Sequence, residues 1–360
     1  MAEIDAFFKL MNKHGASDLH LAAGRQPALR IDGEMERVKY KEFDDDGLKA
    51  ILYEIAPEDK VKVFEEMGDV DFAYEIPGLA RYRANYFQQK NGIGAVFREI
   101  PSAILTCEQL GLPPIVRRLA SLPKGLVLVT GPTGSGKSTT LAAIIDEANK
   151  TRQDHIITIE DPIEFIHTSD KAIVNQREVG SHTRSFSAAL RGALREDPDI
   201  ILVGEMRDLE TITLAIEASA TGHLVFATVH TTSAAKTVDR IIEVFPATQQ
   251  AQIRSTLSDG LRAVISQGLF KRIDRKGRVA ALEIMIATNA VRNLIREGKT
   301  YQIPSMLQTG KKYGMQTLDD AIMELLNRKI ISPDEAYTKA NEKSKFSAFL
   351  KNPPADFTEV

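Results

Sequence analysis

The chain has 360 residues, which at roughly 100–200 residues per domain corresponds to two or three domains. Apolar residues make up 43% and charged residues 26% of the chain, and this ordinary composition excludes a collagen-like or largely disordered protein. The 46 Lys and Arg residues against 49 Asp and Glu residues give a formal net charge of −3. The overall charge therefore gives no reason to bind nucleic acid or an anionic membrane.

The sequence contains one cysteine, Cys107, so no disulfide can form within the chain and no cysteine-rich zinc site is expected. The amino-terminal stretch MAEIDAFFKLMNKHG is too charged for a signal peptide, and no apolar run approaches the roughly 18 residues of a membrane span. We therefore expect a cytoplasmic protein whose contact with a membrane depends on a partner.

Residues 1–100 predict a small α+β domain. Apolar residues at positions 4, 7, 8 and 11 have the spacing of a helix, and a second helical stretch is expected over about 44–66. The segment 29–38 predicts a hairpin, because Asp32-Gly33 supplies the positive φ of a tight turn. Further strands are expected over 69–100, with turns at Pro77-Gly78 and Asn91-Gly92.

Residues 101–124 contain four prolines, which interrupt any long helix and suit a connecting segment. We place a domain boundary and a hinge in this segment. From residue 125 onward, short apolar segments alternate with helical ones, which is typical of a wound α/β sheet with mostly parallel strands. The stretch from about 236 to 360 is predicted to be mostly helical, and its last dozen residues are predicted to be frayed.

The strongest motif is GPTGSGKST, which matches G-x-x-x-x-G-K-[ST] between a strand-like segment and an Ala/Ile-rich helix. This pattern is a P-loop, in which backbone N–H groups point at a phosphate and the following helix adds its positive end. Lys137 is expected to contact the β and γ phosphates, and the Ser138 hydroxyl to ligate Mg²⁺. The predicted nucleotide-binding residues are Gly131, Pro132, Thr133, Gly134, Ser135, Gly136, Lys137, Ser138 and Thr139.

Hydrolysis also needs an acidic group at the carboxyl end of a neighbouring strand, to organise the metal and the attacking water. Two segments qualify. The run IILV ends at Gly204-Glu205, and the run IITI ends at Glu160-Asp161, with Glu164 on the loop beyond. These carboxylates could orient water, or they could merely cap a following helix.

Two further features have two readings each, and a third has one. His230 follows the strand segment HLVFATV, where it could contact a γ phosphate or simply be a hydrogen-bonded structural residue. Arg81 and Arg83 lie on one face of the strand ARYRANYF, either as a solvated face or as arginine fingers supplied from another domain or subunit. The basic stretch 269–278 is interpreted as a charged hairpin loop.

These blocks resemble the hexameric ATPases of type II and type IV secretion and of type IV pili. The resemblance rests on the P-loop, an aspartate box TIEDPIE, a Walker B block ILVGEMRD and a histidine box TGHLVFATVHT, and it extends over nearly the whole chain. The stretch GASDLHL is similar to the start of that family's PAS-like first domain. The resemblance implies a RecA-like core with a mainly parallel sheet over 125–360, and a PAS-like domain over 1–100.

Within this family the chain is most similar to the pilus retraction ATPases. The pilus assembly and type II secretion ATPases carry a four-cysteine zinc loop, whereas LFKRIDRKGR stands at that place here, so no zinc is expected. The segment AVRNLIRE looks like the AIRNLIRE motif associated with retraction, although its apolar residues alone form an ordinary helix stripe. The motif comprises Ala290, Val291, Arg292, Asn293, Leu294, Ile295, Arg296 and Glu297, with Val291 in place of isoleucine.

The resemblance also implies roles for individual residues. Arg81 and Arg83 are expected to reach the nucleotide from the first domain, and Glu160 and Glu205 to assist the metal through water. Gly204 stands where many P-loop enzymes place a metal-binding aspartate, which leaves open whether Glu205 acts as the general base or holds Mg²⁺ through water. Whether Glu205 or Glu164 is the general base is also left open. The residues expected to act in catalysis are Glu205, Glu164, Lys137 and His230.

The function that the resemblance implies is that of a ring-forming motor: a hexameric, Mg²⁺-dependent ATPase that drives type IV pilus retraction and twitching motility. Its implied partners are further copies of itself, a pilus inner-membrane platform protein and a paralogous retraction ATPase, at the cytoplasmic side of the inner membrane. No nucleic acid partner is expected. The alternatives are an accessory pilus or secretion ATPase of the same family, a nucleic-acid translocase, and a nucleotide-gated adaptor with negligible turnover.

Overall fold

The computed structural model describes residues 2–31, 33–100 and 103–351. The chain divides into two compact units, one formed by Met1–Ala103 with Pro162–Ile166 and the other by Ile104–Asp161 with His167–Val360. Each unit has its own sheet and its own apolar core, and each is described separately below.

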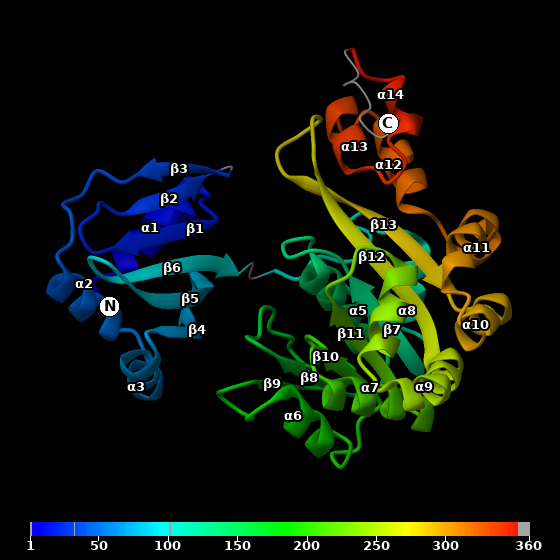
Figure 1. Ribbon diagram of the computed structural model, residues 1–360. Coiled ribbons are helices and arrows are strands. Elements are labelled where there is room, and N and C mark those ends of the chain that lie inside the picture. The colour runs from blue at the N-terminus through cyan, green and yellow to red at the C-terminus, as the bar shows by residue number, and fades with distance from the viewer. Residues whose placement is uncertain (1, 32, 101–102, 352–360) are drawn as a thin grey trace. The chain divides into compact units, whose positions relative to one another are not determined.

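The first unit is built on a six-stranded antiparallel sheet with the strand order β3-β2-β1-β6-β5-β4 (Figure 1). Its helices and strands are α1 (Asp5–His14), β1 (Asp18–Ala22), β2 (Ala28–Ile31), β3 (Glu34–Arg37), α2 (Asp45–Tyr53), α3 (Glu58–Met67), β4 (Asp69–Ile76), β5 (Ala80–Gln89) and β6 (Gly92–Ile100).

The expected single helix over 44–66 is wrong, because the structure has two helices there. Asp44 caps α2 by accepting a hydrogen bond from the Gly47 amide at 2.8 Å. Pro57 then separates α2 from α3, since its ring cannot continue a helix from the preceding turn. The predicted hairpin is present as β2 and β3, with Gly33 at φ 95°; Asp32 lies outside the described residues.

Aromatic side chains fill the core between the helices and one face of this sheet. The ring of Phe8 on α1 stacks on Tyr82 of β5, with ring centroids 4.2 Å apart. Tyr86, four residues further along β5, donates its hydroxyl to the carbonyl oxygen of Leu52 on α2 at 2.8 Å. This bond links the sheet to α2 through a fully buried polar group, which needs such a partner.

The second unit is built on a seven-stranded sheet with the strand order β13-β12-β7-β11-β10-β8-β9. All neighbouring strands are parallel except β12 and β13, which pair antiparallel. Its elements are α4 (Pro114–Leu119), β7 (Gly125–Thr130), α5 (Lys137–Thr151), β8 (His155–Glu160), β9 (Ile173–Glu178), α6 (Phe186–Ala193), β10 (Ile200–Val203), α7 (Leu209–Thr221), β11 (Leu224–Val229), α8 (Ala234–Glu243), α9 (Ala247–Gly260), β12 (Leu261–Lys271), β13 (Arg278–Ile286), α10 (Asn289–Arg296), α11 (Ile303–Thr309), α12 (Leu318–Asn327), α13 (Pro333–Lys339) and α14 (Ser344–Ser347).

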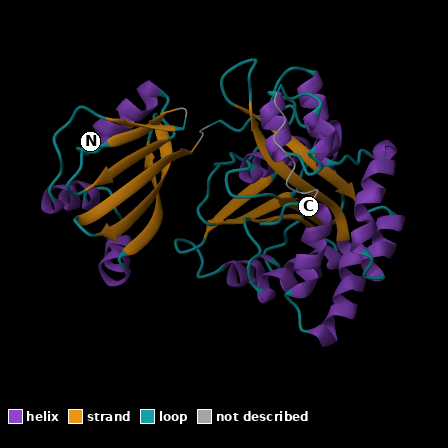
Figure 2. Ribbon diagram, turned by 45° about the horizontal axis from the view of Figure 1, so that its top comes forward, coloured by secondary structure: helices purple, strands orange, loops and turns teal. Residues whose placement is uncertain are grey.

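Helices cover both faces of the parallel sheet (Figure 2). The cluster that contains Val127 and Phe226 packs against α4 and α5, whereas the cluster that contains Leu128 and Val225 packs against α6, α7, α8 and α9. Burial on both faces explains why these strands read as continuous apolar runs rather than as alternating ones. The carboxyl ends of the parallel strands therefore meet at a single edge, where the loops that follow them lie.

The carboxyl-terminal region is helical from α10 onward, as predicted, but it is preceded by two long strands that the sequence analysis did not anticipate. The segment 236–286 was expected to be mostly helical, yet β12 and β13 extend the sheet beyond β7. The basic stretch 269–278 contains the turn between these strands, as its interpretation as a hairpin loop required. The segment 104–124 contains only the short helix α4, and the hinge stays a prediction; Pro101 and the end of the chain from residue 352 lie outside the described residues.

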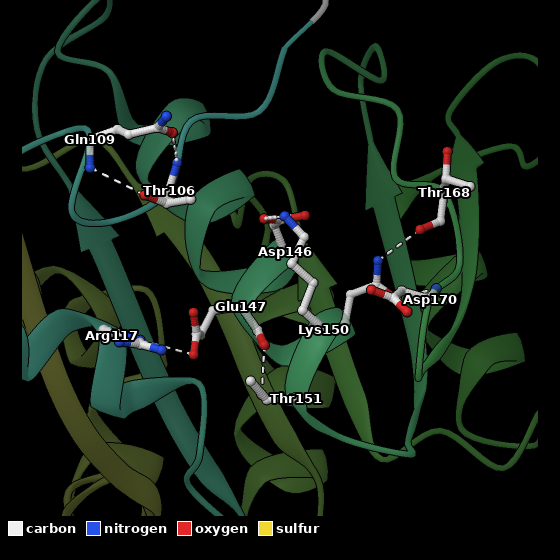
Figure 3. A network of polar contacts seen from close by, with 10 residues as sticks. Thr106, Gln109, Arg117, Asp146, Glu147, Lys150, Thr151, Thr168 and Asp170 are labelled. Atoms are coloured by element: carbon white, nitrogen blue, oxygen red, sulfur yellow. Dashed lines mark hydrogen bonds and ion pairs between the residues drawn. The ribbon is translucent and has the colours of Figure 1, made fainter.

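The helix that follows the P-loop is fixed at its far end by polar contacts (Figure 3). Arg117 on α4 forms an ion pair with Glu147 at 2.9 Å. The Asn149 side chain donates to the carbonyl oxygen of Thr168 at 2.8 Å and accepts from the amide of Asp170 at 3.0 Å. Because α5 is tied to α4 and to this loop, its amino end is held at a defined place relative to β7.

We expect Tyr86→Phe to destabilise the first unit by about 1–3 kcal/mol, because the buried carbonyl of Leu52 would lose its shorter hydrogen bond and keep only the one from the Ile55 amide at 3.4 Å. Tyr82→Phe is the matched control, since the Tyr82 hydroxyl is buried without a hydrogen-bond partner among the described residues. Its removal should change stability by less than about 0.5 kcal/mol. Hydrogen exchange of the β5 and β6 amides measures both, and equal loss of protection in the two variants would contradict the expectation.

Candidate nucleotide-binding and hydrolysis site

The predicted P-loop lies between β7 and α5 at the carboxyl edge of the sheet. Gly131, Gly134 and Gly136 have φ values of 140°, 76° and 87°, a backbone conformation that residues with a side chain rarely adopt. A Cβ atom at Gly131 would lie 2.3 Å from the carbonyl oxygen of Gln267. The glycines are therefore required both for the turn and for its close approach to β12.

The side chains of the loop fit a bound polyphosphate. Lys137 donates from Nζ to the carbonyl oxygens of Gly131 and Pro132, at 3.0 and 3.1 Å, so its ammonium group lies over the loop. The Ser135 hydroxyl is buried and has no hydrogen-bond partner among the described residues. Ser138 is exposed in the first turn of α5, where a hydroxyl can reach a metal ion bound to phosphate. The positive end of α5 favours an anion at the same place.

Glu205 follows β10, and the structure brings it to His230, which follows β11. The distance from Glu205 Oε1 to His230 Nε2 is 3.0 Å, and Arg207 Nε donates to the same oxygen at 2.5 Å. Burial alone would raise the pKa of Glu205, but the hydrogen bond from Arg207 and the charges of His230 and Arg207 outweigh it and lower that pKa. The carboxylate is thus ionised and already holds two donors.

The loop that carries Glu205 is tied to β11. The Thr228 hydroxyl donates to the carbonyl oxygen of Gly204, and the Met206 amide donates to the carbonyl oxygen of Thr228 at 3.0 Å. A second link joins β7 to the residue after His230, because the Thr130 hydroxyl donates to the Thr231 carbonyl at 3.0 Å. The P-loop strand, the Glu205 loop and His230 therefore form one connected set.

Glu160 ends β8 on the far side of β10. Its Oε1 accepts from the Thr158 hydroxyl at 2.7 Å and from Gln176 Nε2 on β9 at 3.2 Å. Asp161 is exposed and interacts electrostatically with Arg207. Glu164 lies on the loop beyond, within the segment Pro162–Ile166, and its role stays a prediction.

Arg81 and Arg83 lie on β5 with their side chains on the face opposite the core, since Tyr82 and Ala84 between and beside them are buried. Arg83 forms an ion pair with Asp71 on β4, at 3.5 Å between Nε and Oδ1. An acidic group of the same sheet therefore balances Arg83, which agrees with the solvated-face reading. The finger role of both arginines stays a prediction.

The AVRNLIRE segment coincides with α10, which Thr288 caps. Val291 and Ile295 are fully buried in the core shared with α9, and Arg296 pairs with Asp259 at 2.9 Å. The apolar stripe is thus ordinary helix packing, as its residues alone indicated. The special role of the motif in retraction stays a prediction.

A family model described as "Type II/IV secretion system protein" matches residues 3–336. The chain belongs to this family. It is 57% identical to "Type IV pilus retractation ATPase PilT" of Pseudomonas aeruginosa over 334 residues, which cover 93% of this chain and 97% of that protein. It is 52% identical to the "Twitching motility protein" of Neisseria gonorrhoeae, over 89% of this chain and 86% of that protein.

Among solved structures, the fold matches the crystal structure of "the Pilus Retraction Motor PilT and Bound ADP", with a TM-score of 0.87 and 45% identity. The match covers 96% of this chain and 98% of that one. These findings confirm the predicted secretion-ATPase family, the fold class and the enzyme class, an ATPase. Pseudomonas aeruginosa also has a second relative, "Type IV pilus ATPase PilU", which is 37% identical over 97% of this chain and 91% of that protein.

The glycine at the Walker B position of this secretion ATPase has a steric reason. A Cβ at Gly204 would lie 3.0 Å from the Ile159 carbonyl oxygen and 3.2 Å from the Glu160 Cα. An aspartate there would press on the backbone of β8, which cannot move aside as a flexible side chain can. The carboxylate at this strand end therefore belongs to the next residue, Glu205.

The sequence analysis did not identify three polar residues that hold the site. Arg207 was visible two residues after Glu205, but nothing in the pattern paired the two. Gln176 and Gln267 lie on β9 and β12, two strands that were not predicted. Their contacts could be found only once the strand order placed them beside β8 and β7.

Within the described ranges, no three histidine, cysteine or acidic side chains gather in a way that could hold a metal ion. A P-loop Mg²⁺ site needs no such cage, because phosphate oxygens and waters supply most ligands. No helix in the described part of the chain has the length and apolar character needed to cross a bilayer.

We expect Arg207→Gln to move the acid limb of the ATPase pH profile to higher pH. The hydrogen bond and charge of Arg207 lower the pKa of Glu205, so activity that needs the ionised carboxylate persists as pH falls, until the pH reaches that lowered pKa. Removing Arg207 raises the pKa and brings the loss of activity to a higher pH. The measurement is kcat/KM for ATP across the acid range.

Arg191→Gln serves as the control for this change, because Arg191 pairs with Glu210 on an exposed helix surface instead. It removes one positive charge from the same unit without touching Glu205. An acid limb that stays in place in Arg207→Gln, or shifts equally in both variants, would contradict the assigned cause.

Proposed function

We propose that this chain is the ATPase motor of type IV pilus retraction, and that it binds ATP at the P-loop. One observation carries the site assignment. Glu205 and His230, which follow two different strands, meet within 3.0 Å at the sheet edge where Lys137 crosses the P-loop. Two relatives that match most of this chain are named for pilus retraction and for twitching motility, which supports the pilus as the structure on which the motor acts.

In this proposal the loop amides and Lys137 hold the β and γ phosphates, and Ser138 ligates Mg²⁺. The metal ion, when bound, neutralises charge on the phosphate oxygens. Glu160 at the end of β8 and Glu205 after β10 would help to hold that ion through water. The donor set of one hydroxyl and outlying carboxylates fits a hard cation that keeps most of its waters.

The electrostatics of Glu205 favour a particular role. A general base works best when its pKa lies near the working pH, whereas the pKa of Glu205 is lowered. Glu205 is therefore suited to orient the attacking water as a fixed acceptor, more than to remove its proton outright. His230, which is hydrogen-bonded to the same carboxylate, would contact the γ phosphate and so couple its presence to the position of Glu205.

We further propose that the arginines of the first domain complete the site. Arg81 and Arg83 would approach the nucleotide from another domain or subunit, as the charge on the γ phosphate favours a closed arrangement. Closure would require the hinge at 101–124, and loss of the γ phosphate would release it. In a ring, most simply a hexamer of this chain, staggered closures would move a central partner.

The proposed partner is the cytoplasmic face of a pilus inner-membrane platform protein, which would recruit the motor to the membrane. The existence of a full-length relative, PilU, beside PilT in one organism supports a paralogous second ATPase as a further partner. The net charge of −3 supports the expectation that nucleic acid is not a partner.

We expect Lys137→Ala and Glu205→Gln to separate binding from hydrolysis. Lys137→Ala should weaken MgATP binding about tenfold or more, because a charge-assisted contact to phosphate is lost. Glu205→Gln should keep binding within a few-fold yet lower kcat by roughly 100-fold or more, since water orientation is lost. Calorimetric titration and phosphate release measure the two effects.

Glu210→Gln is the control for this pair, because Glu210 lies on the exposed surface of α7. Among the side chains of the described residues, its ion-pair partner is Arg191. It should behave as the parent protein. Equal phosphate release by Glu205→Gln and the parent would leave a nucleotide-gated adaptor as the better description. Stimulation by single-stranded DNA with a steep salt dependence would favour the translocase.

We expect cells that lack this gene to regain pilus retraction with the parent protein and not with Lys137→Ala. Fluorescently labelled pili would show the retraction events directly, and immunoblots would verify equal protein levels. Glu210→Gln should restore retraction. Cells that retract equally well with Lys137→Ala would refute the motor assignment.

A further inference from the structure

A buried amide on the neighbouring strand contacts the P-loop. Gln267 lies on β12, one residue past the pair Ser266 and Thr130 where β12 and β7 are still in register. Only 4% of Gln267 is exposed. Its Nε2 donates to the carbonyl oxygen of Ser135 at 2.7 Å, and its Oε1 accepts from the Thr140 hydroxyl at 2.7 Å. One side chain thus joins the P-loop to the first turns of α5.

The chemistry of the partners fixes the orientation of this amide. The Ser135 carbonyl can only accept, so the NH₂ group of Gln267 must face it. The oxygen of Gln267 then faces Thr140, whose hydroxyl can donate. Both ends of the amide are satisfied in this orientation, whereas a flip would place two acceptors together at Ser135 and leave that carbonyl without its donor.

A phosphate-binding loop creates the need for such a donor. When backbone N–H groups point at the phosphate, the carbonyl of the same stretch turns toward the protein interior. A buried carbonyl without a donor costs about 1–3 kcal/mol. Gln267 supplies that donor for Ser135. Without it, the Ser135 carbonyl would favour other loop conformations, in which an amide of the loop or Lys137 donates to it.

The P-loop packs closely against Gln267. A Cβ at Gly136 would lie 2.9 Å from Gln267 Nε2, and a Cβ at Gly131 would lie 2.3 Å from the Gln267 carbonyl oxygen. The loop therefore rests on Gln267 at both ends of its turn. Loss of the amide leaves a space that the loop can enter.

We propose that Gln267 is a positioning residue that keeps the P-loop in its phosphate-binding conformation and thereby sets the affinity for nucleotide phosphates. This inference rests on the proposed function of the P-loop as the nucleotide site. Gln267 contacts the loop and not the nucleotide, so we expect its loss to change the affinity for nucleotide more than the rate of the chemical step.

The test measures MgADP binding to the full chain by calorimetric titration, with ATP turnover in parallel. Gln267→Leu should weaken MgADP binding roughly 5-fold to 50-fold and raise KM for ATP more than it lowers kcat. Gln267→Glu keeps the shape and the acceptor for Thr140 but faces the Ser135 carbonyl with a second acceptor. It should bind weakly at neutral pH and recover, relative to the parent protein, as acid protonates the carboxyl and restores a donor.

Gln316→Leu is the matched control, because Gln316 Nε2 donates to the carbonyl oxygen of Leu282 on β13 at 2.8 Å. Within the described residues its side chain forms no hydrogen bond to the P-loop. It loses the same kind of hydrogen bond to the same sheet, so its melting temperature should fall while its affinity for MgADP stays within twofold of the parent. The acid recovery of Gln267→Glu is a second readout where circular dichroism shows the variant folded at every pH, because a buried carboxylate also destabilises the fold until acid protonates it.

The outcomes separate the two levels of the argument. A parent protein that does not bind MgADP would refute the proposed function of the P-loop. A parent that binds, together with a folded Gln267→Leu that binds equally well, would refute the role of Gln267 alone. Equal weakening in Gln267→Leu and Gln316→Leu would also refute it, because the effect would then follow general destabilisation.

Discussion

The candidate site depends on the direction in which one short stretch of backbone points its amides. Between β7 and α5, three glycines with positive φ turn the chain so that N–H groups can face a phosphate. The carbonyl of Ser135 then turns inward and meets the amide of Gln267. The parallel sheet adds the candidate reacting groups at one edge, because Glu160 ends β8 while Glu205 and His230 follow β10 and β11.

Much of this arrangement could be predicted from the sequence, because the motifs are local. The P-loop needs only its own glycines, lysine and flanking elements, and the apolar runs that became β7, β8, β10 and β11 are continuous since both faces are covered. The failures lie where a long-range contact decides the structure. The segment of β12 has an unclear periodicity and becomes a strand by pairing with β7, and the helix expected over 44–66 is divided at Pro57.

The contacts of Glu205 could not be predicted for the same reason. Arg207 follows it by two residues, but only the turn after β10 brings the guanidinium back to the carboxylate. His230 is distant in sequence and arrives through the pairing of β10 with β11. These two donors decide the charge state of the carboxylate, so the chemistry of the site is set by strand order as much as by residue type.

The position of Lys137 has a consequence for the turnover cycle. Its ammonium group is hydrogen-bonded to the carbonyls of Gly131 and Pro132, and a phosphate must compete with those oxygens for the same protons. The carbonyl oxygens of the loop therefore compete with the nucleotide phosphates for Lys137. Binding of the nucleotide is opposed by these two hydrogen bonds of Lys137, which must be exchanged for bonds to phosphate. Release of the nucleotide is assisted because the carbonyl oxygens accept the lysine again, and this favours the release of ADP before the next ATP binds.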